Sequence, residues 1–486
     1  MHDTHPSLAG AARNFAEAAR SLSDAGVVGA RARAAIDELL GLLAEQEEWR
    51  VYVDATRNLG HQASSVMLLR RLIEVTSFRG RVTVVYAEPS PASRATAGKI
   101  ALMLRGVDPT RLCETVARHG SCNEIRFLPL SAARELQEVC AFGFTGGADE
   151  MSFNGASVLN VRYFMRVQPY LWDDPPAASA EPYYVCSRIE QPDGAHLYPV
   201  QAWPQLRTLG LPPPALPGDE AEAWRWYVEE QRFDPGLACR MNNARLLLKA
   251  RAEHAALLWP IYGLQHFRER AAGILLRCTL LGLRVARRRR KPVLLCSLCA
   301  PEDVPDALEI VARDAGPAAL HVHRAFDGSW RDIGAALRTA LAREAGGGSV
   351  HLVEVGPIAM DAFHQCLAQA DLPCIVEGQA SANLLSTLGK PFLQLLRADH
   401  AIRECYPRLP DDAASHAHAR TLESACAQLR DVHPQAALDR LARLVDDAFE
   451  GSLHGYFRSL AHHFAQPQHD KLMVMLLALR EAMLAA

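Results

Sequence analysis

Short apolar runs alternate with longer segments of helical periodicity along most of the chain. The runs predict strands, and segments with apolar residues at helical spacing predict amphipathic helices. In the first half, we expect strands at 49–53, 81–87, 124–130, 140–145 and 161–167. The helices expected between them lie at 63–78, 93–104 and 132–139. Strands that alternate with crossover helices are typical of a parallel, doubly wound sheet, so this half predicts a Rossmann-like domain.

The same alternation restarts after Pro292. There we expect strands at 293–298, 319–325, 350–355, 374–376 and 392–396. The helices expected between them lie at 302–315, 330–344, 359–370 and 380–388. This pattern predicts a second Rossmann-like domain.

Helical segments surround the two predicted sheets. Two helices are expected within 7–46, one at 219–231, one at 243–285 with a break near Pro260, and four between 413 and 485. We therefore expect α/β architecture with two Rossmann-like domains facing across a cleft. The expected divisions are N-terminal helices at 1–47, an N-terminal domain with a helical insertion at 48–290, a C-terminal domain at 291–410 and a C-terminal helical region at 411–486.

Composition narrows the class of protein. The chain has 486 residues, more than one hydrophobic core usually serves. Hydrophobic residues make up 49% and charged residues 22%, and the net charge of −3 gives no basic field for nucleic acid. Neither a signal peptide nor a long apolar span is evident, and the 12 cysteines are scattered singly. We expect a cytoplasmic protein, in a bacterium or in a host cell after export.

Three loops follow predicted strands, at the edge where open parallel sheets bind ligands. The first holds Asp54, Asn58, Gly60, His61 and Gln62, and the second begins at Gly356. The third, at 377–381, contains Glu377, Gly378, Gln379 and Ser381. Gly378 allows a ligand to approach the backbone, and the free N–H groups at the following helix start suit a phosphate. The alternative is an ordinary strand–helix–strand unit without a ligand.

These loops resemble those of GT-B glycosyltransferases, which carry a Gly-His or Gly-Asp loop after the first strand and a later strand-turn-helix unit ending in Gly-(Lys/Arg)-Pro. Asn58, Gly60 and His61 match the first loop, and 377–381 with 389–391 match the second. Bacterial protein-arginine rhamnosyltransferases are a similar branch.

The chain departs from that branch at both loops. It has three extra residues between Asp54 and Asn58, and His61 stands where the branch has aspartate. Gln379 and Ala380 replace glutamate and aspartate. The resemblance is therefore to the superfamily, and it does not extend to an arginine acceptor or a deoxythymidine donor.

The resemblance implies metal-independent transfer of a sugar from a nucleotide-sugar donor to an unidentified acceptor, either protein or glycan, with no other cofactor. The helix start at Ser381, Ala382 and Asn383 would hold the donor diphosphate. Gly356, Glu377, Gly378 and Gln379 would complete the donor site, with Glu377 on a ribose or sugar hydroxyl. Asp54 and His61 are the candidate bases, and Asn58, Gly60 and Gln62 would line the acceptor loop.

Several alternatives remain at this point. A sugar-nucleotide epimerase of the same architecture would need acid residues across the cleft. A non-catalytic scaffold would use the helical segments 7–46, 219–285 and 413–485 for partner contacts. The basic run at 287–291 could contact anionic lipid or nucleic acid, although a solvated helix end explains it more simply. His321, His323 and His351 alternate in strands, and we expect no metal there.

Overall fold

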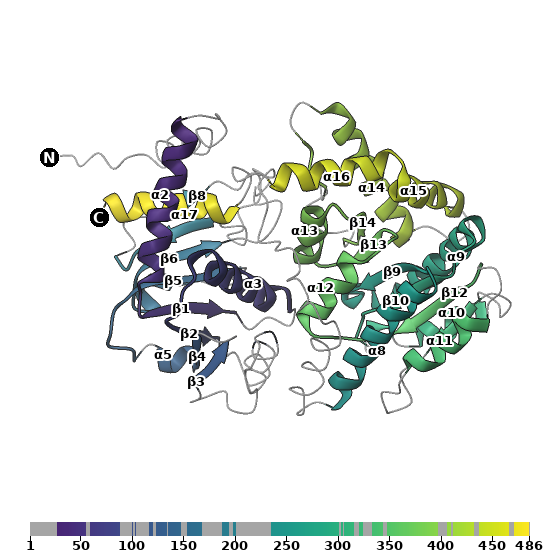
Figure 1. The fold of residues 1–486 in the computed structure, drawn as a ribbon, viewed down its shortest axis with the longest axis horizontal. Coiled ribbons are helices and arrows are strands. Elements are labelled where there is room, and N and C mark those ends of the chain that lie inside the picture. The colour runs from purple at the N-terminus through teal and green to yellow at the C-terminus, as the bar shows by residue number, and fades with distance from the viewer. Residues whose placement is uncertain are drawn as a thin grey trace. The chain divides into compact units, whose positions relative to one another are not determined.

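The computed structural model divides into two compact units (Figure 1). Unit 1 is Met1–Leu211 with His463–Ala486, and unit 2 is Pro212–His462. The structure describes residues 27–54, 59–87, 100, 103, 116–119, 123–133, 135–146, 153–167, 187–193, 198–200, 235–300, 303–304, 306–314, 320–323, 333–343, 348–396, 406–409, 412–431, 437–465 and 471–485. No helix among them is both long and apolar enough to cross a membrane.

The described strands of unit 1 form an eight-stranded sheet in the order β3-β4-β2-β1-β5-β6-β7-β8. The five strands from β4 to β6 in this order are parallel. Strand β3 pairs with β4, β7 with β6 and β8 with β7, each in antiparallel fashion. The strands are β1 Glu48–Val53, β2 Arg81–Tyr86, β3 Val116–His119, β4 Asn123–Pro129, β5 Cys140–Gly146, β6 Val161–Val167, β7 Ser187–Glu190 and β8 Tyr198–Val200. The helices are α2 Val27–Ala44, α3 Leu59–Thr76, α5 Leu130–Ala133, α6 Gly155–Val158 and α17 Lys471–Ala485.

The core of unit 1 forms because the central strands carry mostly apolar side chains on both faces. Every residue of β1 after Glu48 is buried, as expected for a strand covered on both sides. Trp49 stacks on Phe78 at 3.8 Å between ring centroids, and Phe142 meets it edge-on. Helix α17 packs against β6, β7 and α2, so this late segment of the chain belongs to unit 1 (Figure 1).

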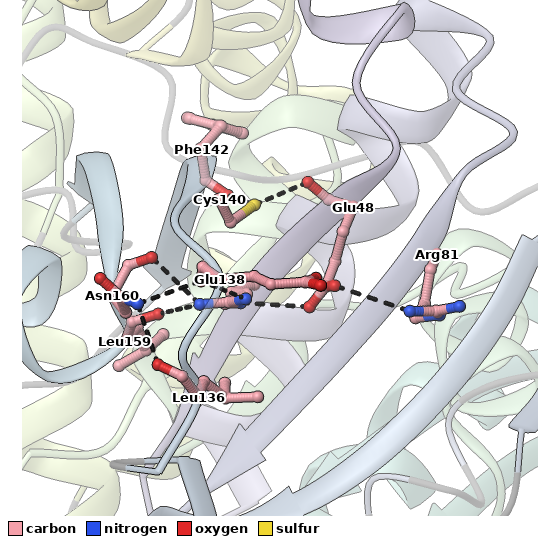
Figure 2. Close-up of polar contacts among 9 residues, drawn as sticks. Glu48, Arg81, Leu136, Glu138, Cys140, Phe142, Leu159 and Asn160 are labelled. Atoms are coloured by element: carbon pink, nitrogen blue, oxygen red, sulfur yellow. Dashed lines mark hydrogen bonds and ion pairs between the residues drawn. The ribbon is translucent and has the colours of Figure 1, made fainter.

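A buried arginine ties together three segments of unit 1, and Figure 2 labels its partners Glu48, Glu138, Leu159 and Asn160. Arg50 on β1 is only 1% exposed. Its guanidinium donates to the carbonyls of Leu159 at 2.7 Å, Asn160 at 3.0 Å and Glu138 at 3.0 Å, and pairs with Glu48 at 3.1 Å. We call these five residues the Arg50 clamp. It gives the buried Leu159 carbonyl a donor, and it adds a second donor to the carbonyls of Asn160 and Glu138, which also accept from the Cys140 N–H and the Asn160 side chain.

The Arg50 clamp explains why the predicted helix at 132–139 is wrong. Helix α5 ends at Ala133, and 135–139 are not helical. The carbonyl of Glu138 accepts from Arg50, and the carbonyl of Leu136 accepts from the Asn160 side chain at 2.9 Å. Tertiary hydrogen bonds thus replace the helical ladder that the local sequence favours.

Unit 2 is built on a six-stranded parallel sheet in the order β11-β12-β10-β9-β13-β14. The strands are β9 Leu257–Tyr262, β10 Val293–Ser297, β11 Leu320–His323, β12 Val350–Glu354, β13 Cys374–Val376 and β14 Phe392–Gln394. The helices are α8 Pro235–Glu253, η2 Gln265–Arg270, α9 Ala271–Arg289, α10 Ala307–Asp314, α11 Ile333–Arg343, α12 Met360–Ala368, α13 Gln379–Leu388, α14 Ala413–Asp431, α15 Leu438–Glu450 and α16 Ser452–Ala465.

The two sheets share a strand order. In each, the first strand is central, the second lies on one side, and the chain later crosses to the other side, to β5 in unit 1 and to β13 in unit 2. The expected pair of Rossmann-like α/β units is confirmed at this level. Open parallel sheets bind ligands where the strand order reverses, which here is between β1 and β5 and between β9 and β13.

The predicted helix at 243–285 is wrong in its middle, because β9 interrupts it between α8 and α9. Pro260 makes this strand hard to recognise, since proline rarely occurs in a central strand. The backbone N–H of Leu258 faces the β13 side and donates to Asp371. Backbone groups two residues apart in a strand face the same side, so the backbone nitrogen of Pro260 also faces β13. Pairing with β13 begins only at Ile261, so the missing N–H of Pro260 costs no ladder bond.

The domain division expected from the sequence therefore differs from the observed one. Helix α8 and strand β9 belong to unit 2, although the sequence suggested that this domain begins at 291. The expected C-terminal helical region at 411–486 is divided between the units, because α17 packs in unit 1. Strands β3, β7 and β8 and the short helix α6 were not predicted, whereas the strands expected at 49–53, 81–87, 124–130, 140–145 and 161–167 and those expected after Pro292 lie close to their predicted positions.

The basic run at 287–291 ends α9 and faces α15. Arg288 pairs with Asp446, and Arg289 pairs with Glu450 at 2.6 Å. Arg290 adopts a left-handed conformation with φ of 54° and caps the helix. Much of the positive charge of this run is thus neutralised within unit 2.

Candidate active site

The carboxyl ends of β9 and β13 meet at the switch point of unit 2. Gly263 follows β9 with φ of +72°, a conformation that side chains other than glycine rarely adopt. A Cβ atom at Gly263 would lie 3.1 Å from Cβ of Glu377, the first residue after β13. The glycine therefore lets the β9 loop pass closely over Glu377.

Glu377 is held by His266 from that loop. The His266 ring nitrogen Nδ1 contacts the Glu377 oxygen Oε1, and the backbone N–H of His266 donates to the same oxygen at 3.2 Å. The Glu377 side chain is 12% exposed. Its other oxygen, Oε2, is buried and has no hydrogen-bond partner among the residues that the structure describes. A buried carboxylate oxygen without a donor is costly, and a ligand hydroxyl would satisfy it.

Helix α13 begins beside this carboxylate with no side-chain cap. Gly378 is the N-cap, and its φ of −74° and ψ of 137° are open to any residue. Ser381 is buried, and its Oγ lies 3.7 Å from the place of a Cβ on Gly378. The glycine is thus not needed for backbone conformation, and its absent side chain leaves the helix start open to a ligand. Gly389 ends the helix at φ of +64°, as the sequence predicts.

The free N–H groups of α13 are those of residues 379–381. The N–H of Ala382 already donates to the Gly378 carbonyl at 3.2 Å, and that of Asn383 belongs to the helical ladder. The sequence suggested that Ser381, Ala382 and Asn383 would supply the donors. The free N–H groups lie two residues earlier, at 379, 380 and 381. Ala382 and Asn383 are buried beneath the helix start.

Gly356 does not lie beside Glu377. It follows β12 with φ of +76°, and its N–H donates to the Ser297 carbonyl at 3.1 Å. Three strand spacings of about 4.8 Å each separate β12 from β13, or roughly 14 Å. Gly356 thus borders the same edge of the sheet without joining the cluster formed by Glu377, His266 and the α13 start.

Sequence reasoning missed three polar residues near this edge. Tyr262 ends β9, and burial raises its pKa to about 12, with Cys299 and Asp303 adding to the effect. Its hydroxyl therefore stays protonated at physiological pH. Arg268 pairs with Asp303 at 2.8 Å. Together with His266 they were hidden because β9 was assigned to a helix. The signal that could have revealed them is the apolar run 257–262 ending at a glycine.

In unit 1, Asp54 directly follows β1 and is buried, with the Tyr52 hydroxyl 3.4 Å from its Oδ1. Gln62 is fully buried, and its amide donates to the Asp54 carbonyl at 2.9 Å. Gln62 thus fixes the backbone after β1. Gly60 and His61 lie in the first turn of α3, where only their backbone is described, and Asn58 lies outside the described residues.

Helix α3 packs tightly over the carboxyl end of β5. The Ser65 hydroxyl donates to the Gly146 carbonyl at 2.8 Å and accepts from the Gly146 N–H at 3.1 Å. A Cβ on Gly146 would lie 2.9 Å from the Ser64 carbonyl oxygen, so only glycine allows this approach. At this edge of the sheet, Asp54 supplies a buried carboxylate directly after β1.

Three histidines lie together on β11 and β12. His351 is buried, stacks on His321 at 4.8 Å between ring centroids, and shares a hydrogen bond with His323 at 3.0 Å. Burial, together with His321 and His254, lowers the pKa of His351 to about 3. Within the described part of the chain, no group of three metal-ligating side chains is arranged to hold an ion.

His351 makes the stability of unit 2 depend on pH. An unfolded histidine titrates near pH 6.5, so the unfolded chain binds a proton at this residue between about pH 6.5 and 3 while the folded chain does not. Stability should be complete above pH 6.5 and fall by up to about 1.4 kcal/mol per pH unit below it. His351→Gln should flatten this slope in urea unfolding, whereas the exposed His462→Gln should not. An unchanged slope in His351→Gln would contradict this account.

Comparison of the chain with protein-family models finds no match, and comparison with curated proteins likewise finds none.

Proposed function

We propose that the chain is a GT-B glycosyltransferase that takes a nucleotide-sugar donor and needs no metal ion. The observation that carries this proposal is the uncapped start of α13 beside the unpartnered oxygen of Glu377, at the switch point of a parallel sheet. The free N–H groups of the helix start would be satisfied by an anion, and the Glu377 oxygen Oε2 would be satisfied by a hydroxyl. A nucleotide diphosphate sugar offers both.

The backbone N–H groups of residues 379–381 would bind the diphosphate. As the bond between the anomeric carbon and the diphosphate breaks, negative charge develops on the leaving oxygen. Fixed N–H donors and the positive end of the α13 dipole meet that charge without rearrangement, which stabilises the transition state. The Ser381 hydroxyl, close to Gly378, can add a further donor.

Glu377 would bind a hydroxyl of the ribose or the sugar. Because His266 engages Oε1 through two contacts, the carboxylate is held in one orientation with Oε2 available. A positioned acceptor of this kind selects ligands that carry a hydroxyl at the matching place, since a ligand without it leaves a buried charge unpaired.

The proposal assigns the acceptor side to unit 1, in the GT-B arrangement of two sheets with facing carboxyl edges. Asp54, or His61 in the following helix, would take the proton of the acceptor as its oxygen or nitrogen attacks the anomeric carbon. Asp54 is favoured by its position directly after the central strand β1 and by the Tyr52 hydroxyl beside it.

A thermal-shift screen against UDP, GDP, dTDP and ADP in the presence of EDTA tests the donor assignment. One of these nucleotides should raise the melting temperature, because a ligand at about a hundred times its Kd stabilises the folded state by about 2.7 kcal/mol. Absence of any shift with all four would contradict the transferase and favour the scaffold. A shift without transfer to any acceptor, but with interconversion of the sugar, would favour the epimerase.

A further inference from the structure

We propose that unit 2 carries a second ligand site, which binds a small phosphate ester with an apolar body. The site is a cavity of about 700 Å³ between α14, α15 and the start of α16, three helices that lie together in Figure 1. Cavities of this volume are typical of small-molecule sites. The proposal does not depend on the nucleotide-sugar site at α13, since it uses different residues.

Three arginines give this cavity its charge. Arg420 comes from α14, and Arg440 and Arg443 come from α15. None of them forms a hydrogen bond or an ion pair with any residue that the structure describes. Three unneutralised guanidinium groups around one cavity repel each other, and an anion between them would remove that repulsion.

Three of the four acidic residues of α15 are already paired with arginines of α9, so they leave the cavity arginines without a partner among the described residues. Asp439 pairs with Arg284 of α9, and Asp446 pairs with Arg288. Glu450 pairs with Arg289 at 2.6 Å. Helix α15 thus pairs Asp439, Asp446 and Glu450 with α9, while its two unpaired arginines line the cavity.

Asp447, the one carboxylate among the described residues of the cavity wall, is also engaged. Asp447 accepts from the backbone N–H of Ser452 at 2.7 Å and of Leu453 at 3.2 Å, and from the Ser452 hydroxyl at 3.0 Å. These bonds satisfy the free N–H groups at the start of α16. Asp447 therefore serves as a helix cap, and the cavity keeps a positive field.

The rest of the wall fits an uncharged body with a polar substituent. Leu441, Leu444 and Leu453 supply apolar surface. Gln428 donates to the Ser424 hydroxyl at 3.1 Å, and its oxygen Oε1 is buried with no partner among the described residues. That oxygen can accept from a ligand hydroxyl or amine.

The cavity is built on helices that are fixed in place. Arg277 of α9 donates to the backbone carbonyls of Gln428 at 3.1 Å and Arg430 at 3.4 Å, at the end of α14. Arginine binds phosphate through paired N–H groups in a planar fork, which favours a phosphate ester over a simple halide ion. A net charge of −3 over the chain argues against a general polyanion surface.

Titration calorimetry with naphthyl phosphate, naphthol and inorganic phosphate tests this proposal at physiological salt. Naphthyl phosphate should bind at least tenfold more tightly than either naphthol or inorganic phosphate, since only it uses both the charge and the apolar wall. Arg440→Gln and Arg443→Gln should each raise its Kd about tenfold. Arg343→Gln is the matched control, because Arg343 is an exposed helical arginine of unit 2 that does not line the cavity. It should leave the Kd unchanged.

Several results would overturn the proposal. These are the absence of saturable binding up to millimolar naphthyl phosphate, an equal affinity for naphthol, and an unchanged Kd in the Arg440→Gln, Arg443→Gln double variant. Tighter binding of a glutamate-rich helical peptide than of naphthyl phosphate would instead identify a protein-docking surface. All three arginines are exposed, so the variants should fold, and melting temperatures in the absence of ligand confirm this. A nucleotide shift that survives in the double variant separates this site from the one at α13.

Discussion

Arg50→Met should destabilise unit 1 by about 3–5 kcal/mol, the range expected when one partner of a buried ionic network is removed. Methionine fills much of the same space but cannot donate. The substitution leaves the carbonyls of Leu159, Asn160 and Glu138 without their shared donor and leaves Glu48 without its nearest cation. Urea unfolding, with hydrogen exchange of peptides covering β1, measures the loss.

Two further variants distinguish the effect of burial from the effect of charge on the stability that Arg50 provides. Arg81→Met removes a cation from the same neighbourhood, where it lies 3.8 Å from Glu48 and 44% exposed (Figure 2). It should cost less than about 1 kcal/mol, as exposed pairs do. Arg50→Lys should give an intermediate loss, because lysine keeps the charge without the planar fork. Equal losses for Arg50→Met and Arg81→Met would contradict the role given to the Arg50 clamp.

Asp54→Asn should reduce the rate of sugar transfer by about 10²–10⁴, the usual contribution of a general base. Asparagine keeps the shape of the side chain, and the hydrogen bond from Gln62 uses the Asp54 backbone carbonyl, so the loop after β1 should be retained. Nucleotide binding should also be retained. Release of nucleoside diphosphate from a nucleotide sugar, measured with and without acceptor, gives the rate.

Tyr52→Phe and His61→Ala complete this comparison. Tyr52→Phe removes the hydroxyl beside Asp54 and should have a smaller effect than Asp54→Asn. If His61 is the base, His61→Ala should produce the large loss and Asp54→Asn a small one. Unchanged rates in both Asp54→Asn and His61→Ala would refute the assignment of a base to this loop.

Local sequence patterns were sufficient for most strands and helices because the sheets are parallel and covered on both faces. The buried strand β10 is an apolar run up to its last residue, β1 and β12 are mostly apolar, and the left-handed Gly389 marks the end of α13. What the patterns could not provide were tertiary effects. Pro260 is tolerated in β9 because pairing with β13 begins only at the next residue, Ile261, which depends on the register between distant segments.

The candidate site shows the same limit. The turn at Glu377, Gly378 and Ser381 could be recognised locally, since a strand, a glycine and a helix start follow one another in the chain. The contact between His266 and Glu377 could not, because 111 residues separate them and β9 had been taken for helix. The arginine cavity on α14 and α15 also arises from tertiary packing, which decides which charges of an amphipathic helix are neutralised.

The most direct measurement of the donor assignment is titration calorimetry of the stabilising nucleoside diphosphate with Gln379→Pro and Gln379→Ala, in EDTA. Proline is favoured at the first position of a helix and its φ suits the preceding Gly378, so Gln379→Pro should fold while losing one of the three free N–H groups of α13. Gln379→Ala keeps that N–H. The account predicts that Gln379→Pro weakens binding about tenfold and that Gln379→Ala binds like the wild type. Equal affinity in both variants would contradict a diphosphate site at the start of α13.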